Sequence, residues 1–533
     1  MANPNWKLNL LRAALIIAAG FWVFAPALRG DWLMDDDFYL TQNALLGDPA
    51  RLWKIWFAPG SLIEYYPIEA SLQAIQWHFW RLDTLGYHLT NLVLHLTGAL
   101  LVWRLLSKFG LRLAWLGGFL FAIHPAVVES VAWISEFKNT LSLPFFLLSM
   151  CAWIDYAESK RSRDYLLALG FFLVAMLCKI SMALFPIVIL LYAWWKRGRI
   201  GWRDLMAATP FFVISLVLSY TTIWVGIHFR HSHLQELDIP YVGGIASRLA
   251  LAGTSIAFYL AKFFWPVVMV PIYPKWTVDP PSPAEFFPWL ILGGLIGWFW
   301  SARASWGRHA LLGVGFFLLN LLPFVGLTSV SYMSFAWVMD HFIYLPMIGL
   351  IGLTIAVLEN VEVHVSDPTH SWLAGITAVV LALLAWQSEV YAGVFIGPEM
   401  LWTYTIEHNP TAWLAYNNLG NTYFATGRVP EAIAAYEKAL ELNPSMSEAH
   451  NNLGRVLDHQ GRVPEAIVHY EEALKYDPHF GVAQTNLAHA LARMGLLDQA
   501  IYHYQQALLV NPNDHDALAN LTRLKAGQKT PSR

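Results

Sequence analysis

Long apolar segments follow one another through most of the first 390 residues of this 533-residue chain. The first, from Leu10 to Leu28, is long enough to cross about 30 Å of hydrocarbon. Ten more candidate spans follow, at 88–107, 113–134, 139–157, 164–179, 182–195, 208–227, 286–301, 309–326, 341–358 and 371–390. Only 13% of all residues are charged, against about 25% in soluble domains. The sequence therefore predicts an all-α, polytopic membrane bundle of about eleven spans.

Basic residues gather in the loops that follow alternate spans. These loops carry Arg104, Lys108 and Arg112; Lys160, Arg161 and Arg163; Lys196, Arg197, Arg199 and Arg203; and Arg303 and Arg308. The excess of positive charge on the cytoplasmic side predicts that these loops and the N-terminus are cytoplasmic. An odd number of spans then places the C-terminal region on the periplasmic or extracytoplasmic side of the cell (inner) membrane. Residues 246–270 are also apolar, but a full crossing would move Arg303 and Arg308 outside, so we predict a re-entrant or interfacial segment there.

The first outer loop of this topology, residues 30–87, begins with three consecutive carboxylates, Asp35, Asp36 and Asp37. Further on, the segment RLWKIWF (51–57) combines aromatic and basic side chains, which is typical of a helix lying at the membrane surface. A plain surface loop is the alternative. The three aspartates are either an ordinary solvated loop or the acidic centre of a site at the membrane face, and the carboxylates alone favour the solvated loop.

The C-terminal region repeats itself every 34 residues. Asn-Pro or Asp-Pro pairs end at Pro410, Pro444, Pro478 and Pro512, and between them recur Leu419, Leu453 and Leu487; Gly427, Gly461 and Gly495; Ala432, Ala466 and Ala500; and Tyr436, Tyr470 and Tyr504. This pattern is that of tetratricopeptide repeats (TPRs), which stack into an α-solenoid with a concave groove. We predict a membrane domain over 1–392, a linker over 393–408, three repeats and a capping helix over 409–525, and a disordered tail over 526–533.

Asparagine recurs within the repeats at equivalent positions of NNLG, NNLG and TNLA. These residues are Asn417, Asn418, Asn451, Asn452 and Asn486. Amides that line the inner helices can hydrogen-bond the backbone of an extended peptide whatever its sequence. The alternative is that asparagine before Leu-Gly is simply common in such repeats. We predict that the groove captures an exported protein or peptide.

Several motifs follow one another along the membrane region. They are DDDFYLTQN, YYPI (65–68), YHLTNLVLH (87–95), HPAVVESVAWISEFKNTLSLPFFLLS (124–149), LCKISMALFPIVILLYAWW (177–195), FWPVVMVPIYPKW (264–276) and DHFIYLPMIGL (340–350). In order and spacing, and with LWTYTIEHNP (401–410) leading into the repeats, they resemble the transmembrane and tetratricopeptide-repeat-containing family related to protein O-mannosyltransferases, particularly its bacterial members.

The resemblance implies a C-type (GT-C) membrane glycosyltransferase fold and a polyprenyl-phosphate-linked sugar as donor. It also implies an acidic pair in the first outer loop, which falls on Asp35 and Asp36; Asp37 receives no role. A carboxylate within hydrogen-bond reach of an acceptor hydroxyl can take its proton as general base. We assign that role to Asp35 and an orienting role to Asp36. Direct displacement at the anomeric carbon would invert its configuration.

A departing lipid phosphate needs positive charge or hydrogen-bond donors. Lys179 interrupts an apolar stretch, and ionisable residues at membrane depth are costly enough to suggest a function. Snorkelling at a helix end is the alternative for this lysine. The other candidates for donor phosphate and lipid-sugar binding are Lys138, His124, Glu129 and His341.

Two departures from the family pattern concern arginines. Phe137, Lys138 and Asn139 stand where bacterial relatives often carry Arg-Lys-Asp, and Asp340, His341 and Phe342 stand in place of an Asp-Arg-Tyr-like element. Without these arginines the donor-phosphate site depends on Lys138 and Lys179. No metal ligand set is predicted, and no feature of the sequence supports a divalent metal cofactor. Nothing in the sequence indicates nucleic-acid binding.

These features together predict an inverting glycosyltransferase. It would move a sugar such as mannose from a polyprenyl phosphate to Ser or Thr of an exported protein that the repeats capture. Two alternatives stay open. One is a non-catalytic membrane-anchored scaffold for envelope protein assembly, and the other is sugar transfer to a lipid or polysaccharide.

Overall fold

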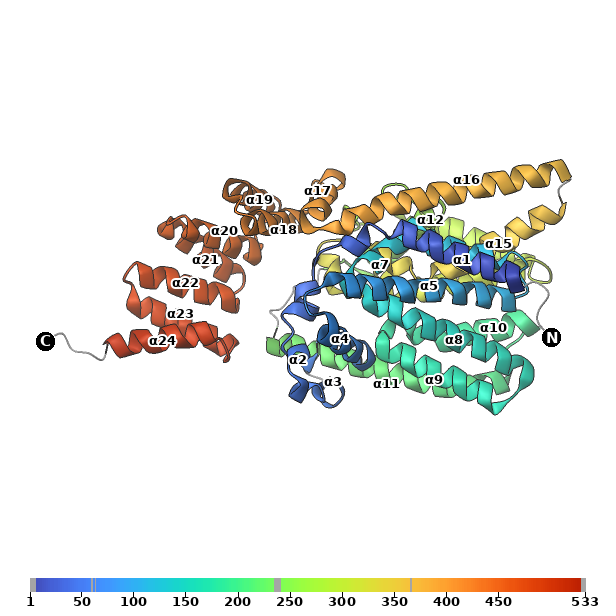
Figure 1. The fold of residues 1–533 in the computed structure, drawn as a ribbon, viewed down its shortest axis with the longest axis horizontal. Coiled ribbons are helices and arrows are strands. Elements are labelled where there is room, and N and C mark those ends of the chain that lie inside the picture. The colour runs from blue at the N-terminus through green and yellow to red at the C-terminus, as the bar shows by residue number, and fades with distance from the viewer. Residues whose placement is uncertain (1–5, 59–60, 63, 234–240, 365–366, 529–533) are drawn as a thin grey trace. The chain divides into compact units, whose positions relative to one another are not determined.

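The computed structural model describes residues 6–58, 61–62, 64–233, 241–364 and 367–528 (Figure 1). Every regular element within these ranges is a helix, which confirms the predicted all-α class. The chain divides into two compact units. The first comprises 1–227, 239–271 and 275–397, and the second comprises 228–238, 272–274 and 398–533.

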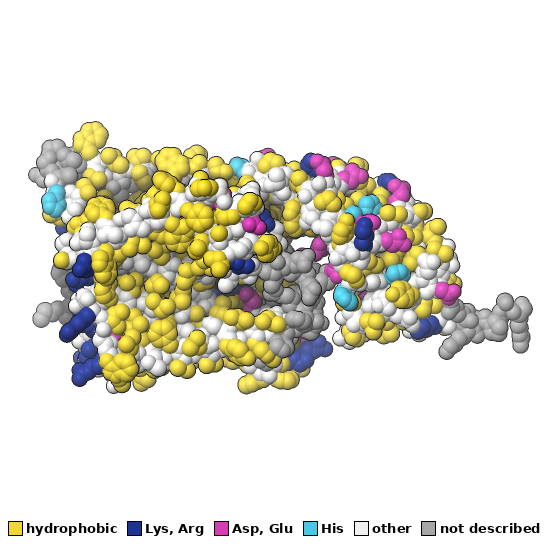
Figure 2. Space-filling view, turned by 180° about the vertical axis from the view of Figure 1, so that it is seen from behind, with side chains coloured by type: hydrophobic (Ala, Val, Ile, Leu, Met, Phe, Trp, Pro, Cys, Tyr) yellow, Lys and Arg dark blue, Asp and Glu magenta, His cyan; other side chains and the backbone are white. Residues whose placement is uncertain are grey.

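The first unit is a bundle of long apolar helices. Its helices are α1 (Trp6–Val23), α4 (Pro67–Trp80), α5 (Thr84–Lys108), α6 (Ala114–Ile123), α7 (Val128–Ala132), α8 (Phe137–Ser159), α9 (Ser162–Cys178), α10 (Phe185–Arg197), α11 (Trp202–His233), α12 (Ile245–Phe264), α13 (Phe287–Ser301), α14 (Gly307–Leu321), α15 (Met347–His364) and α16 (Asp367–Ala392). Within the bundle, α5 packs along α6 and α8, and α8 packs along α9. Many apolar side chains remain exposed on the face shown in Figure 2, as on a surface that faces lipid.

By length and composition, eight helices of the described residues can cross a membrane, or nine if one bent pair is a single span. That pair is Ala114–Ile123 with Pro125–Ala132, bent by 59°. The count is lower than the eleven predicted because α9 and α13 have only 17 and 15 residues. The segment predicted as re-entrant or interfacial, 246–270, contains all but the first residue of α12, a 20-residue helix that is not among the eight.

The first loop folds into short helical pieces rather than an extended strap. These are η2 (Asp37–Thr41), α2 (Ala44–Gly47), η3 (Pro49–Arg51) and α3 (Lys54–Phe57), followed by α4. Leu40, Leu46 and Ile55 are buried in one apolar cluster with Tyr87 and Ile134 of the bundle. This packing holds the loop against the start of α5 and the segment that precedes α8. In place of the predicted surface helix at 51–57 the structure has a single turn, α3; Phe57 on it and Trp53 just before it are exposed.

The second unit confirms the tetratricopeptide repeats. Its helices are α17 (Pro398–His408), α18 (Trp413–Ala425), α19 (Val429–Leu442), α20 (Ser447–His459), α21 (Val463–Tyr476), α22 (Gly481–Arg493), α23 (Leu497–Val510) and α24 (His515–Gln528). The three aligned glycines, Gly427, Gly461 and Gly495, have φ of +77°, +81° and +78°, which favours glycine at the turn between paired helices. The aligned alanines and tyrosines form one buried core.

Two segments that were predicted to be non-helical contain helix in the structure. Residues 393–408, predicted as a linker, form η12 (Gly393–Ile396) and α17. The predicted disordered tail begins at 526, whereas α24 continues to Gln528; residues 529–533 lie outside the described part of the chain.

Candidate functional site

Two breaks in the helical backbone between α6 and α8 position the side chains of the site. α6 ends at Ile123, and His124 is extended because Pro125 follows it. After α7, Trp133 is extended again, and the turn η6 (Ile134–Glu136) leads into α8. The two breaks direct several polar side chains of residues 124–139 into the interior of the bundle, where a continuous helix would have turned some of them outward.

Asp36 ties the first loop to this break. Its side chain is fully buried, and its carboxylate accepts the backbone N–H of Leu33 at 2.9 Å and that of Ser135 at 2.8 Å. The hydroxyl of Ser135 donates to the same carboxylate. Burial raises the pKa of Asp36 to about 7, although these hydrogen bonds oppose the shift. With three protein donors engaged, Asp36 acts as an anchor for the loop.

Asp35 lies beside that anchor and is open to solvent. Enough protein surrounds its carboxyl that desolvation raises the pKa of Asp35, an effect that Lys138 opposes and Glu136 increases. Asp35 is thus within electrostatic range of both residues. Asp37 is exposed, and it accepts a hydrogen bond from the Thr41 hydroxyl at 2.6 Å within its own turn.

Behind the loop lies a buried network of charges centred on Glu136. Lys179 Nζ is 3.7 Å from the Glu136 carboxylate and donates to the side-chain oxygen of Asn139. Asn139 in turn donates to Glu136. His341 Nδ1 donates to Glu129 at 3.0 Å, and its Nε2 is 4.0 Å from Glu136. A buried carboxylate paired with a buried lysine is an arrangement that the removal of one partner would disrupt strongly.

Lys138 extends the network toward the loop. Its ammonium group is 3.5 Å from Glu64 and lies over the ring of Tyr39, 5.2 Å from the ring centroid. Together with the influence of Lys138 on Asp35, these contacts place Lys138 between the open carboxylate and the buried charges.

His124 does not join this network. Its Nδ1 accepts the backbone N–H of Ala126 at 3.2 Å, and its Nε2 donates to the carbonyl of Phe263 at 3.0 Å. Its ring also stacks on Phe263. One ring nitrogen caps the break after α6 and the other bonds to the last turn of α12, so these contacts give His124 a structural position.

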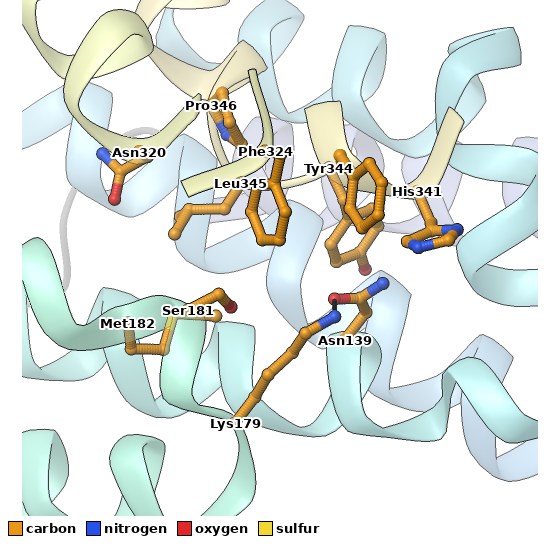
Figure 3. A pocket seen from close by; sticks show the side chains of 11 residues that line it. Asn139, Lys179, Ser181, Met182, Asn320, Phe324, His341, Tyr344, Leu345 and Pro346 are labelled. Carbon is orange, nitrogen blue, oxygen red and sulfur yellow. Dashed lines mark hydrogen bonds between the residues drawn. The ribbon is translucent and has the colours of Figure 1, made fainter. Parts of the chain in front are cut away.

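A narrow pocket opens beside the network (Figure 3). It is lined by Asn139, Lys179, Ser181, Met182, Asn320, Phe324, His341, Phe342, Tyr344, Leu345 and Pro346. Its free space suffices for about one water molecule, so a sugar would require the lining side chains to move. Lys179 and Asn139 point into it from one side and His341 from the other (Figure 3).

Sequence reasoning missed the centre of the network. Glu136 is buried and contacts Asn139, Lys179 and His341, yet in the sequence it is one acid between a serine and a phenylalanine. The available signal was an ionisable residue in a stretch that is otherwise largely apolar. Glu69 of α4 was also missed; burial raises its pKa to about 8. Among the described residues, no group of three or more His, Cys, Asp or Glu side chains could hold a metal ion.

The predicted asparagines of the repeats bond to one another. Asn452 Nδ2 donates to Asn417 Oδ1 at 3.1 Å, and Asn486 Nδ2 donates to Asn451 Oδ1 at 2.9 Å. Asn417 also donates to Asn418 Oδ1 at 3.2 Å. The amides therefore form a ladder that joins α18 to α20 and α20 to α22.

Known protein families match segments in both the membrane unit and the repeats. Residues 73–224 match the family described as dolichyl-phosphate-mannose-protein mannosyltransferase. Residues 417–479 and 459–526 match two tetratricopeptide-repeat families. Among curated protein sequences, none matches the chain significantly.

Solved structures similar to the repeats include three tetratricopeptide domains. The first domain of Spaghetti (RPAP3), bound to an HSP90 peptide, is 21% identical, with 22% of this chain and 94% of that chain covered and a TM-score of 0.22. The Arabidopsis OM64 domain is 18% identical, with 22% and 95% covered and a TM-score of 0.21. The first domain of human RPAP3 is 22% identical, with 22% and 94% covered and a TM-score of 0.22. The chain thus joins a membrane region similar to protein mannosyltransferases to tetratricopeptide repeats.

Proposed function

We propose that this protein is a polyprenyl-phosphate-dependent glycosyltransferase of the cell (inner) membrane. It moves a sugar such as mannose to Ser or Thr of an exported protein that the repeats hold on the outer side. The observation that carries the proposal is the position of Asp35, an open carboxylate beside the basic and acidic network of residues 129–179. Apart from His341, that network lies within the segment similar to protein mannosyltransferases.

The proposed reaction is a single displacement. Asp35 takes the proton of the acceptor hydroxyl, and the hydroxyl oxygen bonds to the anomeric carbon of the sugar. The bond between that carbon and the phosphate oxygen breaks, and the lipid phosphate leaves with the electron pair. The new bond forms on the face opposite the leaving group, so the configuration inverts. The raised pKa of Asp35 suits a general base, because the strength of a carboxylate as a base increases with its pKa.

The remaining residues take supporting roles in this proposal. Asp36 holds Asp35 in place through Ser135. Lys179 and His341, on opposite sides of the pocket, provide donors for the leaving phosphate. Glu136 and Glu129 keep these two side chains oriented before the donor enters.

A deletion strain complemented with variants tests the proposal. Asp35→Asn should reduce glycopeptides of exported proteins, measured by mass spectrometry, at least ~100-fold because a general base is removed. Asp37→Asn is the matched control, since Asp37 lies on the same loop and its carboxylate bonds to Thr41 within its own turn; it should keep wild-type levels. Both variants must be present in the membrane in wild-type amounts.

Two other results would overturn the proposal. Wild-type glycopeptide levels with Asp35→Asn would favour a non-catalytic scaffold for envelope assembly. Unchanged glycopeptides in the deletion strain, together with a lost glycolipid or polysaccharide, would favour transfer to that acceptor instead.

A further inference from the structure

The narrow pocket of the membrane unit has a charged end and an uncharged polar end. Asn139, Lys179 and His341 gather at one side of it, and Ser181 and Asn320 lie at the other side (Figure 3). In the proposed function the lipid phosphate takes its donors from the charged end, and the uncharged end has no role.

Two helix ends form the uncharged end of the pocket. Helix α9 stops at Cys178, and the turn η7 (Ile180–Leu184) that follows it carries Ser181. Asn320 lies in the last turn of α14, which gives way to η9 (Leu322–Phe324) with a proline at its second position. A proline has no backbone N–H to continue the helix. Since η7 packs against α14, the two polar side chains reach the same pocket.

Asn320 offers an acceptor that no protein donor uses. Its side chain is 1% exposed, and its Nδ2 donates to the carbonyl of Phe316 at 2.8 Å. Because a carbonyl oxygen only accepts hydrogen bonds, this contact fixes which end of the amide is the nitrogen. Among the described residues, no donor lies within hydrogen-bond distance of Asn320 Oδ1. A buried acceptor left unpaired is unfavourable, so this end of the pocket fits a ligand group that donates.

The chemistry of this end selects a hydroxyl group. A phosphate oxygen is an acceptor, and Asn320 Oδ1 would repel it. A hydroxyl can donate to Oδ1 and also bond to the hydroxyl of Ser181, which is half-buried in the same wall. The free space is about that of one water molecule, which is the size of one hydroxyl group and too small for an acetamido group.

On a hexose, the hydroxyl of carbon 6 is the one that can reach so narrow a space. The other hydroxyls are bonded directly to ring carbons, so burying one of them would bring the ring into the pocket as well. The hydroxyl of carbon 6 extends from the ring on a methylene group, for which the apolar side chains of Met182, Phe324 and Leu345 provide contacts. Carbon 5, which bears this group, and the anomeric carbon flank the same ring oxygen. The hydroxymethyl group is therefore close to the phosphate.

We propose that the uncharged end of the pocket binds the hydroxymethyl group of the donor sugar, with the hydroxyl of carbon 6 donating to Asn320 Oδ1. Resting on the proposed function, the inference gives the class of sugar that is transferred. It is a hexose with a free hydroxyl on carbon 6, in preference to a 6-deoxyhexose or a pentose. Asn320 is then a residue that determines donor specificity.

Isothermal titration calorimetry with the full-length protein in detergent tests this inference. The probes are farnesyl phosphates that carry mannose, 6-deoxymannose or lyxose, which share their ring hydroxyls and differ only at carbon 6. The mannose probe should bind about tenfold or more tightly than either of the others, because only its hydroxyl pairs with the buried acceptor. Equal Kd values for the three probes would mean that the space holds only water, and would refute the inference.

Variants of the pocket locate this preference. Asn320→Leu keeps a side chain of similar size without the acceptor. It should weaken binding of the mannose probe about tenfold and leave the 6-deoxymannose probe bound at least as tightly, so that the preference disappears. Ser181→Ala is a milder change in case Asn320→Leu does not fold, and it should reduce the preference about threefold.

The matched control is a buried polar side chain away from the pocket. Ser149 is buried in α8 and donates to the carbonyl of Ala168 at 2.7 Å. Ser149→Ala should keep the wild-type ratio of the two Kd values, even if it lowers stability. An unchanged ratio in Asn320→Leu, or in Ser181→Ala if the first variant does not fold, would refute the inference.

The failure of this inference can be separated from failure of the proposed function. Asp35→Asn should bind all three probes with wild-type Kd values whether or not it transfers sugar, because Asp35 acts on the acceptor hydroxyl. If none of the probes binds, the polyprenyl-phosphate donor of the proposed function fails and the inference fails with it. If the probes bind equally well, only the inference fails.

Discussion

Individual buried charges contribute strongly to the stability of the membrane unit. Lys179 and Glu136 are both less than 10% exposed and lie 3.7 Å apart. Removing the lysine in Lys179→Met leaves Glu136 short of one counter-charge, which should lower the free energy of unfolding by about 3–5 kcal/mol. The double variant Lys179→Met/Glu136→Gln should recover most of that loss, because no unpaired charge remains. Denaturant titration in detergent micelles measures both.

An exposed pair provides the control for this cycle. Lys196 and Glu158 lie 3.3 Å apart with about half of each side chain exposed. Lys196→Met should change stability by less than about 1 kcal/mol, since water screens such pairs. If the double variant at 179 and 136 were as unstable as Lys179→Met alone, packing rather than charge would explain the loss.

At the level of elements, a histidine pair links α20 to α21. His450 Nδ1 and His469 Nδ1 are 3.2 Å apart, and the next repeat has His503 Nδ1 at 2.6 Å from Gln484 Oε1 in the equivalent place. Burial lowers the pKa of both His450 and His469, and His450 lowers the pKa of His469 further. The charges of Arg462 and Lys475 act in the same direction, and those of Glu465 and Glu472 oppose it. Two protonated rings cannot share this hydrogen bond.

The sign of the pH effect follows from these lowered pKa values. In the unfolded chain these two histidines titrate near pH 6.5, so they bind protons more readily there than in the folded repeat. The contribution of the neutral histidines to the free energy of unfolding is therefore fully present above pH 6.5. It is lost as the pH falls from there through the lower pKa that they have in the folded repeat. His450→Gln copies the Gln484–His503 pair and should remove part of this loss. Hydrogen exchange of α20 and α21 at pH 5.5 and 7.5, corrected for intrinsic rates, measures it; equal pH dependence in the variant would contradict the prediction.

At the level of the whole molecule, the two units should be separable in function. Removal of α18–α24 (residues 413–533) leaves the membrane unit with its own contacts and with the site around Glu136. We expect the truncated protein to insert in the membrane and to lose glycosylation of protein acceptors, because the repeats that we propose hold these acceptors are gone. Glycopeptide mass spectrometry checks the loss, and a short soluble acceptor peptide at high concentration should restore transfer. A truncated protein with full activity on exported proteins would contradict the role of the repeats.

How far the site could be predicted differs from residue to residue. Asp35, Lys138 and Lys179 were candidates from the sequence, and the structure places them around one network. His124 was a candidate as well, but its ring bonds to the backbone at Ala126 and Phe263. Glu136 was missed, although an ionisable residue in a largely apolar stretch was a signal in the sequence. What separates these cases is the environment of each side chain, which is made by segments that are distant in the sequence.

Local patterns determined the architecture by themselves. Apolar segments of membrane length and a 34-residue period define the helical bundle and the repeats, because each depends on residues within one or two helices. Only the tertiary structure decided which carboxylate is open and which is an anchor. Asp36 meets Ser135 across 99 positions, and His341 meets Glu129 across 212. Such contacts are set by the packing of several helices at once, and burial then fixes whether a charged group is free to react or is held by its partners.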